Sequence, residues 1–216
     1  SRLSLAAEKA AKIGFKEINI NCGCPSKRVT AGNFGISLLL QPILVRDCVE
    51  RIKTKTNKEI SIKTRIGVDQ YNSKEVLDNF LHELNKVEVK KYIIHARIAL
   101  RKKFNTKDNL NVPSLNYERV YKLKRDFKKN KIIINGGFTH TDYRKNIIDN
   151  VDGIMIGREA YKNPWIFNKN INKKDIEMKK NIIIIYLNFL KENFSKYTFN
   201  KNALNHIQNA FNGHEG

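Results

Sequence analysis

The chain has 216 residues, 41% of them hydrophobic, which suffices for one large domain with a buried core. We expect no membrane span, because no run approaches about 18 apolar residues, and three cysteines are too few for a disulfide framework. The formal charge of +20 favours a polyanion, nucleic acid or an anionic membrane face, although a drift of composition toward Lys, Asn and Ile would also produce it.

The predicted elements begin with a helix, since residues 1–15 are amphipathic and resemble neither a secretory signal nor a transit peptide. Five short β-branched runs follow, at residues 17–21, 60–66, 92–96, 131–135 and 153–157. Helical patterns separate them, at 42–55, where Pro42 suits a first helical turn, and at 73–84 and 116–127. Apolar strands that alternate with helices predict a parallel sheet covered by helices.

Beyond Pro164 the pattern becomes purely helical. We therefore predict two domains. Residues 1–168 form the (β/α) portion, which holds the site, and residues 169–216 begin a separate helical domain.

Chemically suggestive residues gather where successive predicted strands end. They are Asn21–Ser26, Lys63–Arg65, His95–Arg97, Asn135–Gly137 and Gly157–Arg158. In a (β/α)8 barrel this end carries the active site. Open doubly wound sheets also bind ligands there, but their usual G-x-G-x-x-G turn does not follow the first strand here. We predict an α/β fold, a TIM (β/α)8 barrel of which this chain holds about the last five strands.

Glycines at the ends of the last two predicted strands suggest an anion site. Glycine lets backbone N–H groups approach an anion closely, and a neighbouring arginine can pair with a phosphate. Simple turns would use the same glycines, but two such turns on consecutive final strands favour a phosphate. The residues concerned are Asn135, Gly136, Gly137, Gly157 and Arg158.

Two further side chains could face a ligand. Lys63 alternates with apolar neighbours and should point into the barrel, as a cation against an electron-rich cofactor ring, unless it is a surface lysine of an edge strand. His95 ends an apolar strand as either a core histidine or part of a polar site, and Arg97 directly after it favours the polar site.

The cysteines of INCGCPSKRV (20–29) do not suggest a metal clip, because no further ligand lies nearby in a suitable spacing. Cys22 continues the strand alternation and should pack as a small apolar side chain. Cys24 lies between Gly23 and Pro25 on a rigid loop, where its thiol could donate or accept a proton.

These residues together resemble the tRNA-dihydrouridine synthases, in particular the A branch, which acts on D-loop uridines. The resemblance covers roughly residues 5–168 and is carried by EININCGCPSKRVTAGNFG, SIKTRIGVD, YIIHAR, VPSLNYERVYKLKRDF, IIINGG and VDGIMIGREAYKNPWIF. It implies an FMN-bearing TIM barrel followed by a helical RNA-binding domain, and a chain truncated at both ends.

The resemblance also implies a chemistry. NADPH reduces the flavin, the flavin passes hydride to C6 of a D-loop uracil, expected at U20 or U20a of tRNA, and Cys24 supplies the proton to C5. Lys63 and His95 resemble the residues that contact the flavin. The residues that resemble its phosphate cradle are Asn135, Gly136, Gly137, Gly157 and Arg158.

Contacts with tRNA are expected from Asn21 of the cysteine motif and from Lys27, Arg28 and Arg97. In the loop after HAR, Lys103 and Thr106 stand where the family usually has Gly and Pro. That loop helps to select the uridine, so the modified position stays open.

Two other functions remain open: a different FMN-barrel pyrimidine oxidoreductase, such as one like dihydroorotate dehydrogenase, and a non-catalytic RNA-binding barrel. The basic charge and the appended helices argue against the first, and the joint presence of Cys24, Lys63 and His95 argues against the second. We expect a monomer without metal or membrane partner, located in the cytoplasm or an organelle.

Overall fold

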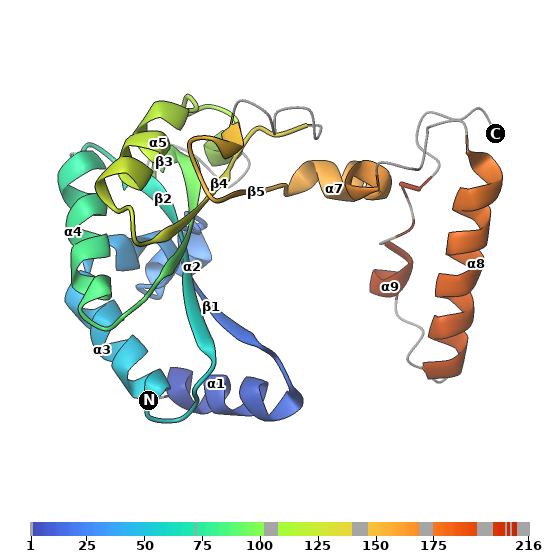
Figure 1. The fold of residues 1–216 in the computed structure, drawn as a ribbon, viewed down its shortest axis with the longest axis horizontal. Helices are drawn as coiled ribbons and strands as arrows, with labels where there is room; N and C mark the ends of the chain where they lie inside the picture. Colours follow the sequence, from blue (N-terminus) through green and yellow to red (C-terminus); the bar gives the residue numbers. More distant parts are fainter. Residues whose placement is uncertain are drawn as a thin grey trace. The chain divides into compact units, whose positions relative to one another are not determined.

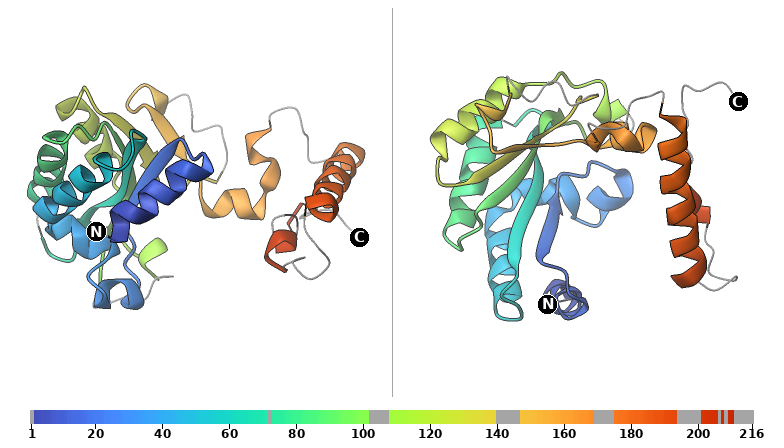
Figure 2. Two further views of the ribbon diagram at one scale, coloured as in Figure 1. Left: turned by 90° about the horizontal axis from the view of Figure 1, so that it is seen from below. Right: turned by 45° about the vertical axis from the view of Figure 1, so that its right-hand side comes forward.

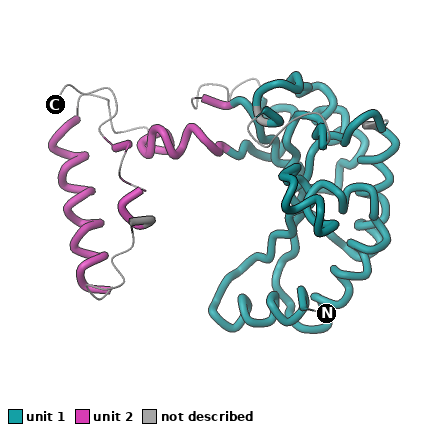
Figure 3. Tube along the Cα trace, turned by 180° about the vertical axis from the view of Figure 1, so that it is seen from behind, with its two compact units in different colours: residues 1–137, 144–155 teal, residues 138–143, 156–216 magenta. Residues whose placement is uncertain are grey.

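The structure is a computed structural model that describes residues 2–71, 73–101, 108–139, 147–168, 175–193, 201–205, 207 and 209–210. The chain forms two compact units, coloured separately in Figure 3. One unit consists of Ser1–Gly137 with Arg144–Met155, and the other of Phe138–Tyr143 with Ile156–Gly216. The domain boundary expected between residues 168 and 169 stays a prediction.

The first unit is built on a five-stranded parallel sheet. Its strands are β1 (Glu17–Cys22), β2 (Glu59–Val68), β3 (Lys91–Ala99), β4 (Lys131–Asn135) and β5 (Gly153–Met155). They pair in the order β1-β2-β3-β4-β5, so each strand lies beside the next one along the chain. Successive strands of a (β/α)8 barrel are ordered in this way. The predicted α/β fold, as part of such a barrel, is confirmed, and so are its five strands.

Helical segments precede β1 and lie between the strands from β1 to β4. They are α1 (Arg2–Ile13), α2 (Lys27–Ala31), η1 (Gly35–Leu40), α3 (Pro42–Lys53), α4 (Ser73–Asn85), η2 (Asp108–Leu110) and α5 (Tyr117–Asp126). Figure 1 and Figure 2 show α3, α4 and α5 along the same side of the sheet. Pro42 begins α3 as predicted, and Asn116 caps α5 because its side chain accepts the Arg119 N–H at 2.9 Å.

The two faces of the sheet differ in polarity, because side chains alternate between faces along each strand. One face is apolar, and its fully buried members include Ile62, Tyr92, Ile94, Ile132 and Ile134. On the other face the register places Asn21 beside Lys63. It also places Arg65 beside His95, and His95 beside Asn135. Polar side chains from four strands therefore share one face near the strand ends.

A second polar cluster lies on that face where the strands begin. The buried Ser61 hydroxyl accepts a hydrogen bond from Asn19 Nδ2 at 2.7 Å and donates one to Glu17. Lys91 Nζ donates to the same carboxylate at 2.6 Å. Burial acts to raise the pKa of Glu17, but the hydrogen bonds from Lys91 and Ser61 prevail and lower it. At neutral pH the Glu17 carboxylate thus joins β1, β2 and β3.

The described part of the second unit is helical. It contains α7 (Arg158–Lys162), η4 (Pro164–Phe167), α8 (Ile176–Asn193) and α9 (Lys201–Asn205). Trp165 Nε1 donates to the Ala210 carbonyl at 2.6 Å, and the Tyr186 hydroxyl donates to the Ala203 carbonyl at 3.0 Å. None of the helices that the structure describes is long and apolar enough to cross a membrane.

Candidate active site at the carboxyl ends of the strands

The loop after β1 holds Cys24 by its backbone on both sides. The side-chain oxygen of Asn21 accepts the N–H groups of Gly23 at 3.0 Å and of Cys24 at 3.2 Å. The Cys24 carbonyl accepts the Ile36 N–H at 3.0 Å. The Cys24 thiol lies 3.4 Å from the Ser26 hydroxyl. The loop therefore presents a half-buried thiol in a fixed position.

Two glycines allow this loop to pack closely. Gly35 has φ +56°, and a Cβ there would lie 2.5 Å from the Cys24 carbonyl oxygen. A Cβ on Gly23 would lie 3.1 Å from the Cα of Thr64 on β2. Any larger residue at Gly35 would push the loop away from η1, since both the backbone conformation and the space exclude a side chain.

The two cysteines of the motif have different environments. Cys22 is fully buried on the apolar face, and burial, assisted by the nearby Cys48, raises its pKa to about 12. The prediction that Cys22 packs as a small apolar side chain is confirmed. Within the described ranges, no group of three or more His, Cys, Asp or Glu side chains is placed to hold a metal ion.

Lys63 reaches across the polar face to β4. Its ammonium donates to Asn135 Oδ1 at 3.2 Å, and Asn135 in turn donates from Nδ2 to the Met155 carbonyl of β5 at 2.8 Å. Burial, and next the charge of Arg65, lower the pKa of Lys63, while Cys24 acts in the opposite direction. The ammonium is thus only partly hydrated, lies within electrostatic range of Cys24, and donates to a neutral amide.

Arg65 is a buried cation of β2, one of the strand-end residues to which the sequence pattern gave no role of its own. Its Nε donates to the Gly23 carbonyl at 3.2 Å, and its Nη1 donates to the carbonyls of Asn109 at 2.9 Å and Ile98 at 3.3 Å. Burial, followed by the charge of Arg97, lowers its pKa to about 10, so it stays charged at pH 7. Its place two residues after Lys63, on the same strand face, was the available signal.

His95 and the glycines after β4 pack against one another. His95 is buried, and a Cβ on Gly136 would lie 2.6 Å from its Cδ2 atom. The Gly136 carbonyl accepts a hydrogen bond from the Tyr117 hydroxyl at 2.7 Å. Gly136 and Gly137 have φ of +119° and +77°, which other residues rarely adopt. This segment can therefore follow its tight path only as glycine.

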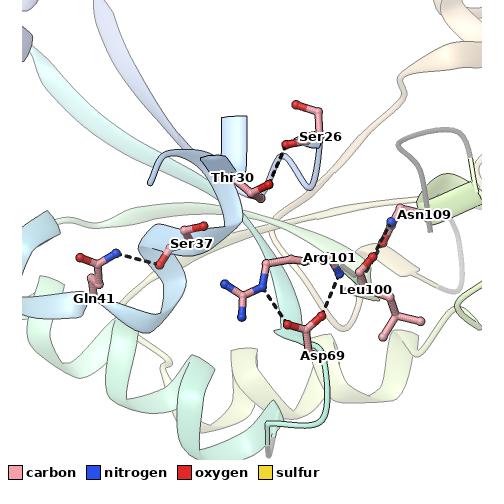
Figure 4. A network of polar contacts seen from close by, with 8 residues as sticks. All are labelled: Ser26, Thr30, Ser37, Gln41, Asp69, Leu100, Arg101 and Asn109. Carbon is pink, nitrogen blue, oxygen red and sulfur yellow. Dashed lines mark hydrogen bonds and ion pairs between the residues drawn. The ribbon is translucent and has the colours of Figure 1, made fainter. Parts of the chain in front are cut away.

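Side-chain hydrogen bonds hold the described residues that follow β3. The Asn109 amide exchanges two hydrogen bonds with Leu100, accepting its N–H at 2.7 Å and donating to its carbonyl at 2.9 Å. Asp69 accepts two bonds from Arg101, from the backbone N–H at 2.8 Å and from Nε at 2.7 Å. Figure 4 shows both contacts. Arg97 donates through Nη1 to the carbonyls of Asn111 and Pro113.

The structure brings seven of the predicted site residues into the first unit near the strand ends. They are Asn21, Cys24, Lys63, His95, Asn135, Gly136 and Gly137. Lys27 and Arg28 follow directly at the start of α2 and are exposed, and Arg97 lies at the end of β3. Gly157 and Arg158 are exposed residues of the second unit, whereas Lys103 and Thr106 lie outside the described residues.

A thiol on a rigid loop and two poorly hydrated cations make a site suited to proton transfer beside a negatively charged group. Burial strengthens electrostatic attraction because little water screens it. The site has neither the paired carboxylates nor the metal ligands of common hydrolytic centres among its described members.

Comparison with known proteins gives a consistent result. The chain matches the family model of dihydrouridine synthases (Dus) over residues 1–216. A tRNA-dihydrouridine(20/20a) synthase of Shewanella oneidensis is 42% identical over 164 residues, which are 76% of this chain and 49% of that protein. One from Synechocystis is 40% identical over 79% of this chain and 50% of its own length. One from Yersinia pestis is 37% identical over 99% of this chain and 64% of its own length. The chain spans about half the length of most of these curated relatives.

Proposed function

The chain belongs to the dihydrouridine synthase family, and from this premise we propose that the protein reduces a D-loop uridine of tRNA, U20 or U20a, to 5,6-dihydrouridine. The names of its relatives support the substrate, since they are tRNA-dihydrouridine(20/20a) synthases. The observation that carries the proposal is the Cys24 thiol, held by its backbone beside the buried cations Lys63 and Arg65.

FMN fits the residues of this site. The Lys63 ammonium is partly buried and donates to the neutral Asn135 amide, so it can accept an electron-rich, anionic ring as a partner. His95 lies on the same sheet face, in register between Arg65 and Asn135. We propose that Lys63 and His95 contact the flavin ring. When bound, FMN would supply the hydride for C6 of uracil after reduction by NADPH.

The phosphate of FMN is assigned to the glycine-bearing segments after β4 and β5. The tight path of Gly136 and Gly137 supports a backbone cradle there. Gly157 precedes α7 and Arg158 begins it, and an arginine can bind phosphate with two parallel hydrogen bonds. The proposed cradle consists of Asn135, Gly136, Gly137, Gly157 and Arg158.

Cys24 is the proposed proton donor. Hydride addition at C6 leaves the ring in need of a proton at C5, and a general acid must stand on a fixed support near that carbon. Cys24 meets this requirement because Asn21 and Ile36 hold its backbone N–H and C=O. The buried cations Lys63 and Arg65 lie within electrostatic range of this thiol.

Binding of tRNA is assigned to Asn21, Lys27, Arg28, Arg97, Lys103 and Thr106. Since the side-chain oxygen of Asn21 already accepts two backbone bonds, we expect its amide nitrogen to make the RNA contact. The exposed Lys27 and Arg28 suit phosphate groups. We further propose that residues 169–216 begin a helical tRNA-binding domain, and that the protein acts as a cytoplasmic monomer.

The experiment that tests this function is a map of dihydrouridine in tRNA from cells that lack the gene. We expect the modification to disappear at position 20 or 20a and to return when the wild-type gene is supplied. Unchanged dihydrouridine at every D-loop position would contradict the proposal. Absorbance of the purified protein in the flavin region tests the cofactor separately, and a colourless protein that binds tRNA would indicate an RNA-binding role.

A further inference from the structure

We propose that Arg65 positions Cys24 by fixing the peptide group that precedes it. This inference rests on the proposed role of Cys24 as proton donor. The peptide between Gly23 and Cys24 is held at both of its polar atoms. Its N–H donates to Asn21 Oδ1 at 3.2 Å, and its carbonyl accepts from Arg65 Nε at 3.2 Å. A peptide fixed at both ends cannot rotate, so the direction of the Cys24 side chain is set.

The other end of the guanidinium is anchored in a separate part of the chain. Nη1 of Arg65 donates to the carbonyl of Asn109 in η2 at 2.9 Å and to that of Ile98 in β3 at 3.3 Å. Asn109 is itself fully buried and is fixed by its two hydrogen bonds with Leu100. Arg65 therefore ties the Cys24 loop to a rigid support rather than to a mobile segment.

The chemistry of these contacts requires arginine. The guanidinium is a planar fork, so that Nε and Nη1 can donate in different directions at the same time. One acceptor, Gly23, lies 42 positions before Arg65 in the sequence, and another, Asn109, lies 44 positions after it. A lysine at this position would keep the positive charge, but its single ammonium cannot reach both the Cys24 loop and η2 in the same geometry.

Burial makes a purely stabilising role for Arg65 a poor explanation. Only 3% of this residue is exposed, and the groups that accept its hydrogen bonds are neutral carbonyls rather than a carboxylate. A buried charge without an ionic partner contributes little net stability compared with an apolar side chain of similar size. The hydrogen bond from Arg65 to the Cys24 loop gives this buried arginine a role in the geometry of that loop.

The test compares Arg65→Met and Arg65→Lys in the protein as its gene encodes it, with Arg46→Met as the matched control. Arg46 is another partly buried arginine of the first unit, paired with Glu83 and Asp47 away from the site. We expect both Arg65 variants to lose about 10²-fold in kcat for tRNA reduction, with KM for tRNA little changed, because a displaced reacting group slows chemistry more than binding. Arg46→Met should keep its kcat.

Hydrogen exchange gives a readout that is independent of activity. In both Arg65 variants, amides of the segment from Gly23 to Ile36 should exchange faster, while those of α4 and β3 stay protected. Uniform acceleration across the unit would indicate a merely structural role and overturn the proposal. Wild-type kcat in Arg65→Lys would overturn it too, since charge alone would then suffice.

The two proposals can fail separately. If the wild-type protein produces no dihydrouridine but the Cys24 loop loosens in the Arg65 variants, the positioning holds and the proposed function fails. If the enzyme is active and the loop exchange is unchanged, the function stands and the positioning fails. Should Arg65→Met not fold, Arg65→Lys, which keeps the charge, decides between these outcomes.

Discussion

Cys22 and Cys24 are separated by one glycine, but their side chains meet different surroundings. Cys22 ends β1 on the apolar face and is fully buried. Cys24 lies beyond the strand on the loop that Asn21 and Gly35 shape. The difference arises because β1 ends at Cys22. The alternation of side chains along the strand buries Cys22, whereas Cys24 is no longer part of the strand. The motif is therefore one packing residue and one candidate acid, not a pair.

Replacement of Cys24 by alanine should leave FMN and tRNA binding intact and slow uridine reduction by about 10²–10⁴-fold, the usual contribution of a general acid. The measurement is single-turnover oxidation of the reduced enzyme by tRNA. Cys22→Ala is the matched control, and we expect it to stay active with a modest loss of stability, about 1 kcal/mol. Equal slowing in both variants would refute the assignment of the acid.

The buried Lys63 ammonium is expected to lower the stability of the folded protein while it favours flavin binding. Its lowered pKa means that the charged form is less favourable in the folded protein than in the unfolded chain. This cost is present at pH values below the lowered pKa and disappears above the ordinary value of 10.5. Lys63→Met should therefore unfold at the same or a higher urea concentration at pH 7, although its flavin content falls.

A matched control for this variant is Lys90→Met, which removes an exposed lysine directly before β3. It should retain flavin and show little change in its urea midpoint. A marked loss of stability in Lys63→Met alone would show that the hydrogen bond to Asn135 outweighs the desolvation of the ammonium.

At the scale of elements, the packing between η1 and the Cys24 loop depends on Gly35. With φ at +56°, alanine would be strained there even without its contacts. Its Cβ would also lie 2.5 Å from the Cys24 carbonyl and 2.6 Å from Val29 Cγ1. Gly35→Ala should cost about 1–3 kcal/mol and displace the loop.

Thermal unfolding and uridine reduction measure these two effects of Gly35→Ala. Gly32→Ala serves as the control, because its φ is −87° and the nearest atoms to a Cβ there belong to the exposed Phe34 ring, which can shift. A Gly35→Ala protein with unchanged melting and unchanged activity would contradict the importance of this close approach.

The strands themselves differ from their predictions mainly at their carboxyl ends. β2 continues to Val68 and β3 to Ala99, beyond the β-branched runs that end at residues 66 and 96. The two strands pair again after a register shift between Arg65 and Gly67. Pairing between the two strands stabilises these added residues in the sheet, and local β-propensity does not predict such pairing. β5 is shorter than predicted and ends at Met155.

For the whole molecule, the cluster around Glu17 should make stability sensitive to acid. The lowered pKa of Glu17 means that its contribution is present above its unfolded pKa, near 4.5, and is lost as pH falls through the folded pKa. Protonation removes the acceptor for Lys91 and weakens the link between β1 and β3. Glu17→Gln should therefore flatten the fall of the urea midpoint between about pH 5 and 3.

The control for acid sensitivity is Glu59→Gln, at the exposed start of β2. It should leave the pH dependence of the urea midpoint close to that of the wild type. If Glu17→Gln loses stability on acidification as steeply as the wild type, the carboxylate does not form the link that the structure indicates.

The architecture of the first unit and the place of its site follow from local patterns in the sequence. β-Branched runs separated by helical periods predict parallel strands, and parallel strands bring their carboxyl ends to one edge. For this reason the sequence predicts that Cys24, Lys63, His95 and Asn135 lie near the same edge. Local patterns suffice here because strand formation and alternation depend on neighbouring residues.

Which of these side chains contact one another depends instead on how distant parts of the chain fold together. The Lys63–Asn135 bond joins residues 72 positions apart, and the Arg65 bonds to Gly23 and Asn109 span 42 and 44. The hydrogen bond from the Cys24 N–H to the Asn21 side-chain oxygen is likewise not visible in the sequence pattern. Sequence patterns cannot supply such contacts, because they depend on the register between strands and on the paths of the loops that close around them.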